Sequence, residues 1–245
     1  MIHFDGPLSI VIFIVEILGC ISFATSGAIT AIRKKADYVG VVVLTLIEIF
    51  GGGLLRDLIL NQGVPHIFYD LEYLFLALLS IIIASIWFII AYFRKSAVII
   101  DKHRHDKWIY IVDAIGVSVF CISGCQFANN IVVDNITLQG KYTLCICSGV
   151  ITGVCGGMCR DVFVGEIPMV FRKHFYMIPC LLGCTLYAIM VLNGCNDFIS
   201  LIFGVLTIII LRTLATIFKW NLPSARGYDE LFVKRESQSN DINNI

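Results

Sequence analysis

The sequence predicts an all-α integral membrane protein with seven transmembrane helices, formed by two inverted three-helix repeats and a seventh helix. Composition, the lengths of the apolar segments and an internal repeat each support this fold class. Of the 245 residues, 58% are hydrophobic and only 15% are charged. Soluble domains contain about 45–50% apolar and about 25% charged residues, so a soluble globular protein is excluded.

The apolar segments are long enough to cross a bilayer, whose hydrocarbon core of about 30 Å requires roughly 20 helical residues. Seven segments qualify: Leu8 to Ile32, Tyr38 to Leu60, Leu71 to Phe93, Ile109 to Ala128, Tyr142 to Gly165, Phe175 to Leu192 and Phe198 to Phe218. No basic region precedes the first segment, and it is too long for the core of a signal peptide. We therefore expect it to be retained as a span.

The basic residues between the spans predict the orientation of the chain. Fourteen Lys and Arg fall on one side of the predicted membrane, whereas Lys141 alone falls on the other. Positive residues favour the cytoplasmic side. We expect a cell-membrane, multi-pass protein with its amino terminus outside and its carboxyl terminus in the cytoplasm.

An internal repeat relates the two halves of the chain. At a shift of 97 positions, Glu16, Gly19, Phe23, Ser26 and Gly27 recur as Asp113, Gly116, Phe120, Ser123 and Gly124. At a shift of 104, Gly52, Gly53, Arg56 and Asp57 recur as Gly156, Gly157, Arg160 and Asp161. Each unit has three spans, so the second copy must enter the membrane from the opposite face. Such inverted repeats are typical of transport proteins.

The repeat and the charge pattern divide the chain into five parts. The first three-helix repeat covers residues 1–93, a cytoplasmic linker 94–108, and the inverted repeat 109–192. The seventh helix covers 193–222. Residues 223–245 are polar and rich in Asn and Ser, which predicts a disordered cytoplasmic tail.

Glycines interrupt the second and fifth spans at equivalent positions: Gly51, Gly52 and Gly53 in one, Gly156 and Gly157 in the other. Each interior glycine costs a helix roughly 1 kcal/mol relative to alanine, so we expect weak or broken helices that line an ion path. The alternative is tight helix packing, since small residues let backbones approach closely.

Four charged residues follow these glycines inside the spans: Arg56, Asp57, Arg160 and Asp161. A charge at the bilayer centre costs about 2.5–3.5 kcal/mol on insertion scales, so these side chains must face one another or water. Adjacent helical residues point in different directions. We therefore expect each Arg to pair across the pseudo-twofold axis with the other Asp or with freed carbonyls, as a charged clamp or gate.

Other polar residues are candidates for the ion path. Glu48 precedes the first glycines, and Thr152 occupies its place in the second copy. Glu48 attracts cations or pairs with Arg56 or Arg212, and the sequence favours neither. Ser26 and Ser123 are helix-packing positions whose hydroxyls could line the path.

Catalytic and metal chemistry has little support. The ten cysteines form no CxxC pair, and they fit small apolar positions within helices. No zinc-protease, serine-hydrolase or P-loop motif occurs. We expect no enzyme activity, catalytic residue, metal, cofactor or nucleic-acid partner.

The sequence resembles the trimeric intracellular cation channels and their prokaryotic relatives, also described as a glycine-transporter domain family. The resemblance covers about Leu8 to Pro223. It rests on "SGAITAIRKKADYVGVVVL", "GGGLLRD", "GGMCRDVFVGEIP" and "RTLATIFKWNLP". It implies a homotrimer with one pore per protomer, lined by the glycine-rich second and fifth helices, and conduction of monovalent cations (K⁺ and Na⁺), with potassium favoured, in contact with membrane lipids. A glycine or small-amino-acid carrier is the alternative, and a non-transporting scaffold is a third class.

Overall fold

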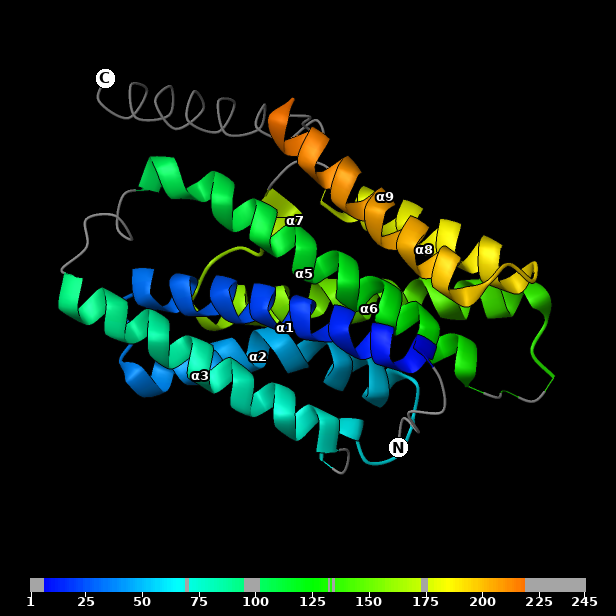
Figure 1. Ribbon diagram of the computed structural model, residues 1–245, viewed down its shortest axis with the longest axis horizontal. Coiled ribbons are helices and arrows are strands. Elements are labelled where there is room, and N and C mark those ends of the chain that lie inside the picture. The colour runs from blue at the N-terminus through cyan, green and yellow to red at the C-terminus, as the bar shows by residue number, and fades with distance from the viewer. Residues whose placement is uncertain are drawn as a thin grey trace, which may run out of the picture.

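The computed structural model describes residues 7–68, 71–94, 102–131, 133, 135–172 and 176–218, and this part of the chain is helical (Figure 1). The elements are α1 (Pro7–Arg33), α2 (Tyr38–Ile59), the 3₁₀ helix η1 (His66–Phe68), α3 (Leu71–Arg94), α5 (Lys102–Asn130), α6 (Leu138–Phe163), α7 (Met169–Arg172), α8 (Met177–Leu192) and α9 (Asp197–Ile217). The predicted all-α fold is confirmed. The predicted tail at 223–245 lies outside the described residues.

Six of the described helices are long and apolar enough to cross a membrane, and α8 is a shorter apolar helix. These seven match the predicted spans within a few residues, except that α5 begins at Lys102, inside the segment assigned to the linker. The 16 residues of α8 span about 24 Å, at about 1.5 Å per residue. It is therefore the span least able to cross the bilayer without local thinning.

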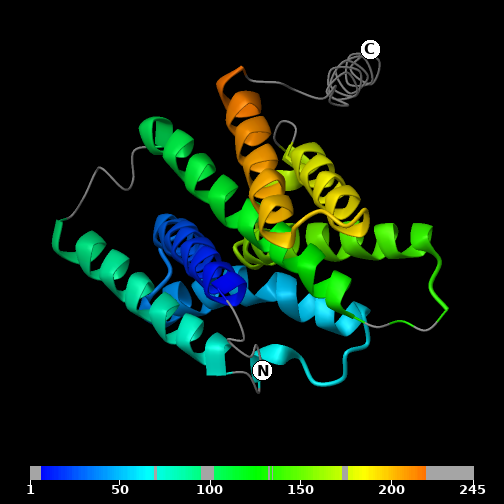
Figure 2. The same cartoon turned by 45° about the vertical axis from the view of Figure 1, so that its right-hand side comes forward.

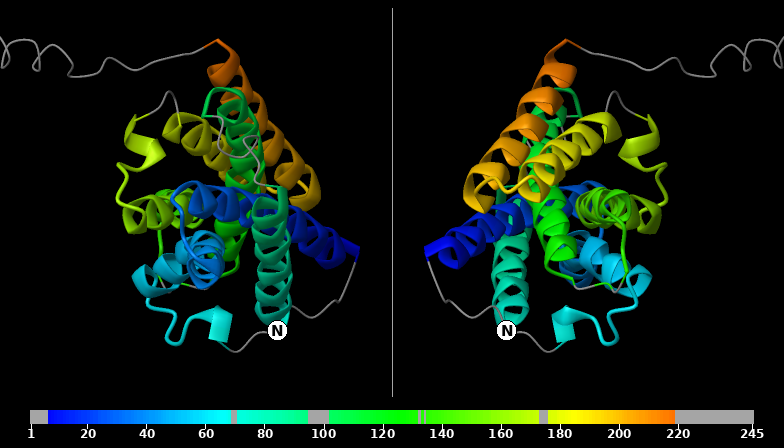
Figure 3. Two further views of the ribbon diagram at one scale, coloured as in Figure 1. Left: turned by 90° about the vertical axis from the view of Figure 1, so that its left-hand side faces the viewer. Right: turned by 90° about the vertical axis from the view of Figure 1, so that its right-hand side faces the viewer.

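The helices form a bundle in which the two repeats interlock. Helix α1 packs on α5, and α2 crosses α6. Helix α3 packs on α1 and α2, whereas α8 and α9 pack on each other and on α5 (Figures 1 and 2). In Figure 3, α3 and α9 lie toward opposite edges of the bundle. The contact between repeats therefore runs through the α1–α5 and α2–α6 pairs.

The ends of α2 and α6 are built alike, as the repeat predicts. Asp37 caps α2 by accepting a hydrogen bond from the Gly40 N–H at 2.7 Å, and Thr137 caps α6 by accepting one from the Gly140 N–H at 3.1 Å. Such caps satisfy backbone donors that have no partner inside the helix. The short helices η1 and α7 then follow α2 and α6 at equivalent positions.

The helices α2 and α6 run without interruption through their glycines, so the predicted break is wrong. The glycines instead permit close packing, as the alternative proposed. A Cβ atom at Gly52 would collide with the Thr152 carbonyl oxygen, and one at Gly156 would collide with the Glu48 carbonyl oxygen. These contacts are equivalent under the repeat, which places the pseudo-twofold axis at the α2–α6 crossing.

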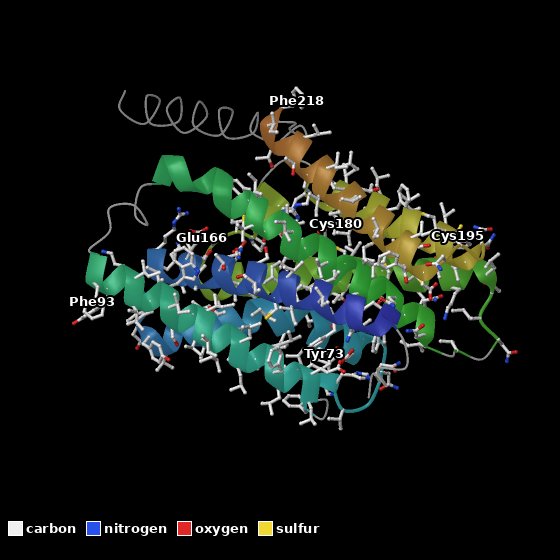
Figure 4. The ribbon with its side chains drawn as sticks, viewed as in Figure 1. Tyr73, Phe93, Glu166, Cys180, Cys195 and Phe218 are labelled. Atoms are coloured by element: carbon white, nitrogen blue, oxygen red, sulfur yellow. The ribbon has the colours of Figure 1, made fainter. Side chains whose placement is uncertain are left out.

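The two ends of the bundle carry different loops. Lys34, after α1, pairs with Glu166, after α6, at 2.6 Å between Nζ and Oε1. In Figure 4, Glu166 and Phe93 both lie toward one end of the bundle, and Cys195 of the α8–α9 loop lies at the other. The carboxyl-terminal ends of α1, α3 and α6 therefore lie toward one end of the bundle.

The close contact at the α2–α6 crossing predicts that alanine substitutions at two adjacent glycines have different effects on stability. Gly52→Ala should lower the free energy of unfolding by about 1–3 kcal/mol, because the added methyl overpacks the crossing. Gly53→Ala is the matched control. Its Cβ would lie 3.9 Å from the nearest atom, Arg56 Nη2, so it should be neutral or slightly stabilising. Melting temperatures in detergent measure both, and equal effects would contradict the crossing.

Candidate functional site

Each motif arginine pairs with the aspartate that follows it in the chain. Arg56 Nε and Nη2 lie 2.8 and 2.7 Å from Asp57 Oδ1. Arg160 Nε and Nη2 lie 2.9 and 2.7 Å from Asp161 Oδ1. All four side chains are buried. The prediction that adjacent residues would not pair is wrong, because the long Arg side chain folds back at the end of its helix.

The aspartates also fix the chain that leaves each helix. Asp57 Oδ2 accepts a hydrogen bond from the His66 N–H at 3.0 Å, and Asp161 Oδ2 accepts one from the Met169 N–H at 2.9 Å. One carboxylate oxygen therefore holds the arginine while the other holds η1 or α7. This repeated arrangement accounts for an Arg-Asp pair at the end of each glycine-containing helix.

The arginines contact the opposite repeat, although not through the predicted aspartates. Arg160 Nη1 donates to Ser26 Oγ at 2.9 Å and also pairs with Glu48 Oε1. The Arg56 guanidinium lies 3.7 Å above the ring of Phe127, on α5. Glu48 therefore pairs with Arg160, and the alternative in which it pairs with Arg56 or Arg212 is wrong.

A small cavity lined by both apolar and polar residues lies beside α2. Its volume is about 30 Å³, room for about two water molecules. Its polar lining residues come from both repeats: Glu16, Arg56, Asp57, Tyr73, Ser123 and Thr152. The Ser123 hydroxyl donates to Glu16 Oε1 at 2.6 Å, which links α5 to α1. The cavity thus places a carboxylate, hydroxyls and a guanidinium around water-sized space within the membrane-spanning helices.

A second cluster occupies the equivalent position on the other side of the α2–α6 crossing. We call it the Glu48 network, comprising Glu48, Asp113, Arg160, Asp161 and Arg212. Arg212 Nη2 lies 2.6 Å from Asp113 Oδ2, which also accepts from the Tyr176 hydroxyl at 3.0 Å. The Arg212 guanidinium lies 3.7 Å above the Tyr176 ring.

The structure therefore divides the predicted site residues into three groups. Ser123, Thr152, Gly53, Arg56 and Asp57 line the cavity. Ser26, Glu48, Arg160 and Asp161 join the second cluster. Gly51, Gly52 and Gly156 lie at the crossing, and a Cβ at Gly157 would lie 3.9 Å from Arg160.

Sequence reasoning missed the two tyrosines, Phe127 and His66 as site residues. Tyr73 and Tyr176 match each other in the repeat, so the sequence carried a sign of their shared position. Phe127 corresponds to Thr30 in the first repeat, so the repeat gave no indication that Phe127 belongs to the site. Among the described residues, no group of three or more His, Cys, Asp or Glu is arranged to hold a metal ion.

Comparison with known proteins gives the same architecture. The sequence profile of a family described as "Glycine transporter" matches residues 13–91 and 110–191, which are the two repeats. The membrane protein YvgT of Bacillus subtilis is 30% identical over 211 residues, which cover 86% of this chain and 95% of YvgT.

Two solved structures of TRIC cation channels are also similar. One has a TM-score of 0.71 and 29% identity, and the match covers 86% of this chain and 95% of the channel. The other, a TRIC trimeric intracellular cation channel orthologue from Rhodobacter sphaeroides, has a TM-score of 0.71 and 25% identity, covering 85% of this chain and 98% of the orthologue. The chain therefore belongs to the glycine transporter family of multi-pass membrane proteins and has the fold of the TRIC cation channels.

Proposed function

We propose that this protein is a channel for monovalent cations, with potassium favoured over sodium, and that it works as a homotrimer with one path per protomer. The observation that carries the proposal is the cavity between the repeats, whose lining includes polar side chains from both of them. It lies within the spans of a chain whose structural neighbours are TRIC cation channels. Polar, water-sized space inside a membrane-spanning bundle is costly unless it serves a path or a buried network.

The path that we propose runs beside the α2–α6 crossing. At its centre, Glu16 supplies negative charge, and the hydroxyls of Ser123 and Thr152 can replace water around a small cation. Arg56 lies in the same lining and opposes cation entry, which suits a gate. A cavity of about 30 Å³ is too small for a hydrated potassium ion, so we assign the described arrangement to a closed state.

A carrier for glycine or another small amino acid is the second candidate. The observations that favour it are the description of the matching family and the inverted repeats, which are typical of secondary transporters. A cavity that holds a carboxylate and a guanidinium could also contact a zwitterion. A scaffold without transport activity would predict neither ion current nor uptake.

A paired measurement separates these functions. Purified protein in a planar bilayer with a potassium chloride gradient should show single-channel steps that reverse near the potassium equilibrium potential. In the same preparation, proteoliposomes should show no saturable counterflow of labelled glycine. Glycine counterflow without single-channel steps would favour the carrier, and the absence of both would favour the scaffold.

We further propose that Arg160 is the stronger of two charged clamps. It pairs with carboxylates of both repeats, Glu48 and Asp161, whereas Arg56 pairs with Asp57 and stacks on Phe127. Removing one partner of a buried ion pair leaves the other charge without compensation. The two arginines should therefore differ in their effect on stability, although the repeat makes them equivalent.

Arg160→Ala should lower the free energy of unfolding by about 3–5 kcal/mol, and Arg56→Ala by clearly less. Arg160→Lys should restore part of the loss, since an ammonium cannot reproduce the planar fork. The control is Lys34→Ala, which removes a partly exposed pair and should cost less than about 1 kcal/mol. Equal losses for the two arginines would contradict the assignment.

We also propose that the amino terminus faces outside and that the ends of α1 and α6 face the cytoplasm. The exposed Cys195 thiol in the α8–α9 loop should then react with a membrane-impermeant maleimide added to intact cells. A cysteine introduced by Lys35→Cys, at the opposite end, should react only after the cells are permeabilised. Cys195→Ser is the control for specific labelling, and the reverse pattern would overturn the orientation.

A further inference from the structure

The Glu48 network contains more acidic than basic groups. Its three carboxylates, on Glu48, Asp113 and Asp161, face two guanidinium groups, on Arg160 and Arg212, and every member is at most 6% exposed. If all five groups were ionised, the network would hold one negative charge without compensation. A buried charge of this kind is strongly unfavourable, so the network requires a proton or a cation.

The hydrogen bonds indicate which carboxylate needs the added charge. Asp161 accepts bonds from Arg160 Nε, Arg160 Nη2 and the Met169 N–H. Asp113 Oδ2 accepts from Arg212 and from the Tyr176 hydroxyl, while Asp113 Oδ1 has no hydrogen-bond partner among the described residues. Glu48 Oε1 accepts from Arg160 Nη1, and the Ser26 hydroxyl adds a hydrogen bond to the same carboxylate. Its Oε2 has no hydrogen-bond partner in the described part of the chain. Glu48 shares Arg160 with Asp161, which takes two of the three bonds from that guanidinium to carboxylates, whereas Asp113 pairs with its own arginine, Arg212. The ionised form of Glu48 is therefore the least supported of the three.

The packing around Glu48 favours a proton over a cation. A Cβ atom at Gly27 would lie 2.6 Å from Glu48 Oε2, so helix α1 packs directly against this oxygen. Arg212 Nη1, also buried and without a partner, adds positive charge to the same network. A proton needs almost no volume and leaves an O–H donor, whereas a cation needs several oxygen ligands and space.

No other charged group described around Glu48 supplies the compensation. Helices α1 and α2 contribute the neutral Ser26 and Thr45. On the Arg212 side of the network, helix α8 contributes the Cys180 thiol, which donates to the Tyr176 carbonyl oxygen at 3.4 Å. The charged groups on α5, α6 and α9 are those already counted in the network.

We propose that Glu48 is a proton-binding site that makes the proposed conduction depend on pH, with the proton bound in the closed, dry state. Glu48 lies on α2 at the crossing with α6, where its carbonyl oxygen packs against Gly156. When the proton leaves, the network carries net negative charge and favours an arrangement that admits water or cations. The state that binds the proton is stabilised at low pH, so conduction rises with pH.

The proton itself can be observed without any transport assay. The infrared spectrum of the full-length protein in lipid nanodiscs should contain the carbonyl band of a protonated carboxyl group at neutral pH. Glu48→Gln should remove this band, whereas Asp197→Asn, at an exposed position in α9, should retain it. A spectrum unchanged by Glu48→Gln overturns the proposal. So does a band that is lost in Asp113→Asn alone, or one that disappears when potassium replaces choline, which would indicate a bound cation.

Single-channel recordings test the proposed pH dependence of conduction, which rests on the proposed channel function. Open probability should rise by about tenfold between about pH 5 and about pH 8, as for a single proton that binds the closed state about tenfold more tightly than the open state. Glu48→Gln should remove this dependence and remain mostly closed, while Asp197→Asn keeps it. A pH dependence that survives Glu48→Gln contradicts the gating role. Absence of current at every pH would refute the channel, whereas the infrared band would still decide the proton site.

Discussion

The close approach of α2 and α6 is the constraint on which the rest of the structure depends. Two helices whose backbones meet at Gly52 and Gly156 have no room for side chains between them, so the polar groups that flank the glycines are held on either side of the crossing. Because the contact is repeated by the pseudo-twofold axis, it creates two related polar sites. One is the cavity beside Glu16 and Ser123, and the other is the Glu48 network.

The low dielectric constant inside the helical bundle explains why the charged side chains in these sites pair with neighbours in their own helix. An arginine that bonds to the next aspartate keeps its partner throughout any movement of one helix against another, whereas a pair across the axis would break when the helices separate. The same aspartates also hold the chain that follows each helix, because Asp57 accepts from the His66 N–H and Asp161 accepts from the Met169 N–H. The Arg-Asp pair at each helix end is therefore complete within one repeat. The contacts of Arg160 with Ser26 and Glu48 couple the two repeats.

The sequence predicted the helical fold well because segment length, apolar composition and the internal repeat are properties of the chain itself. It also singled out Gly52, Gly156 and the two Arg-Asp motifs, although it did not predict that each arginine pairs with the aspartate beside it. It failed where the result depended on packing geometry. Helix propensity indicated a break at Gly51–Gly53, but the α2–α6 contact outweighs that local preference. The rule that adjacent helical residues diverge did not anticipate an arginine that folds back at a helix end, and nothing in the sequence placed Phe127 beneath Arg56.

The departures from symmetry are what distinguish the two polar sites chemically. Where the second repeat has Thr152, the first has Glu48, and Arg212 on α9 lies outside both repeats. Thr152 satisfies its hydroxyl locally, by donating to the Ser148 carbonyl oxygen at 2.7 Å, and it lines the cavity without adding charge. Glu48 instead engages Arg160 and adds an acid to a buried network. A perfectly symmetric chain would present two equal sites. Substitution at this single pair of positions, together with the added seventh helix, leaves one site with water-sized space and gives the other a third carboxylate and a second guanidinium.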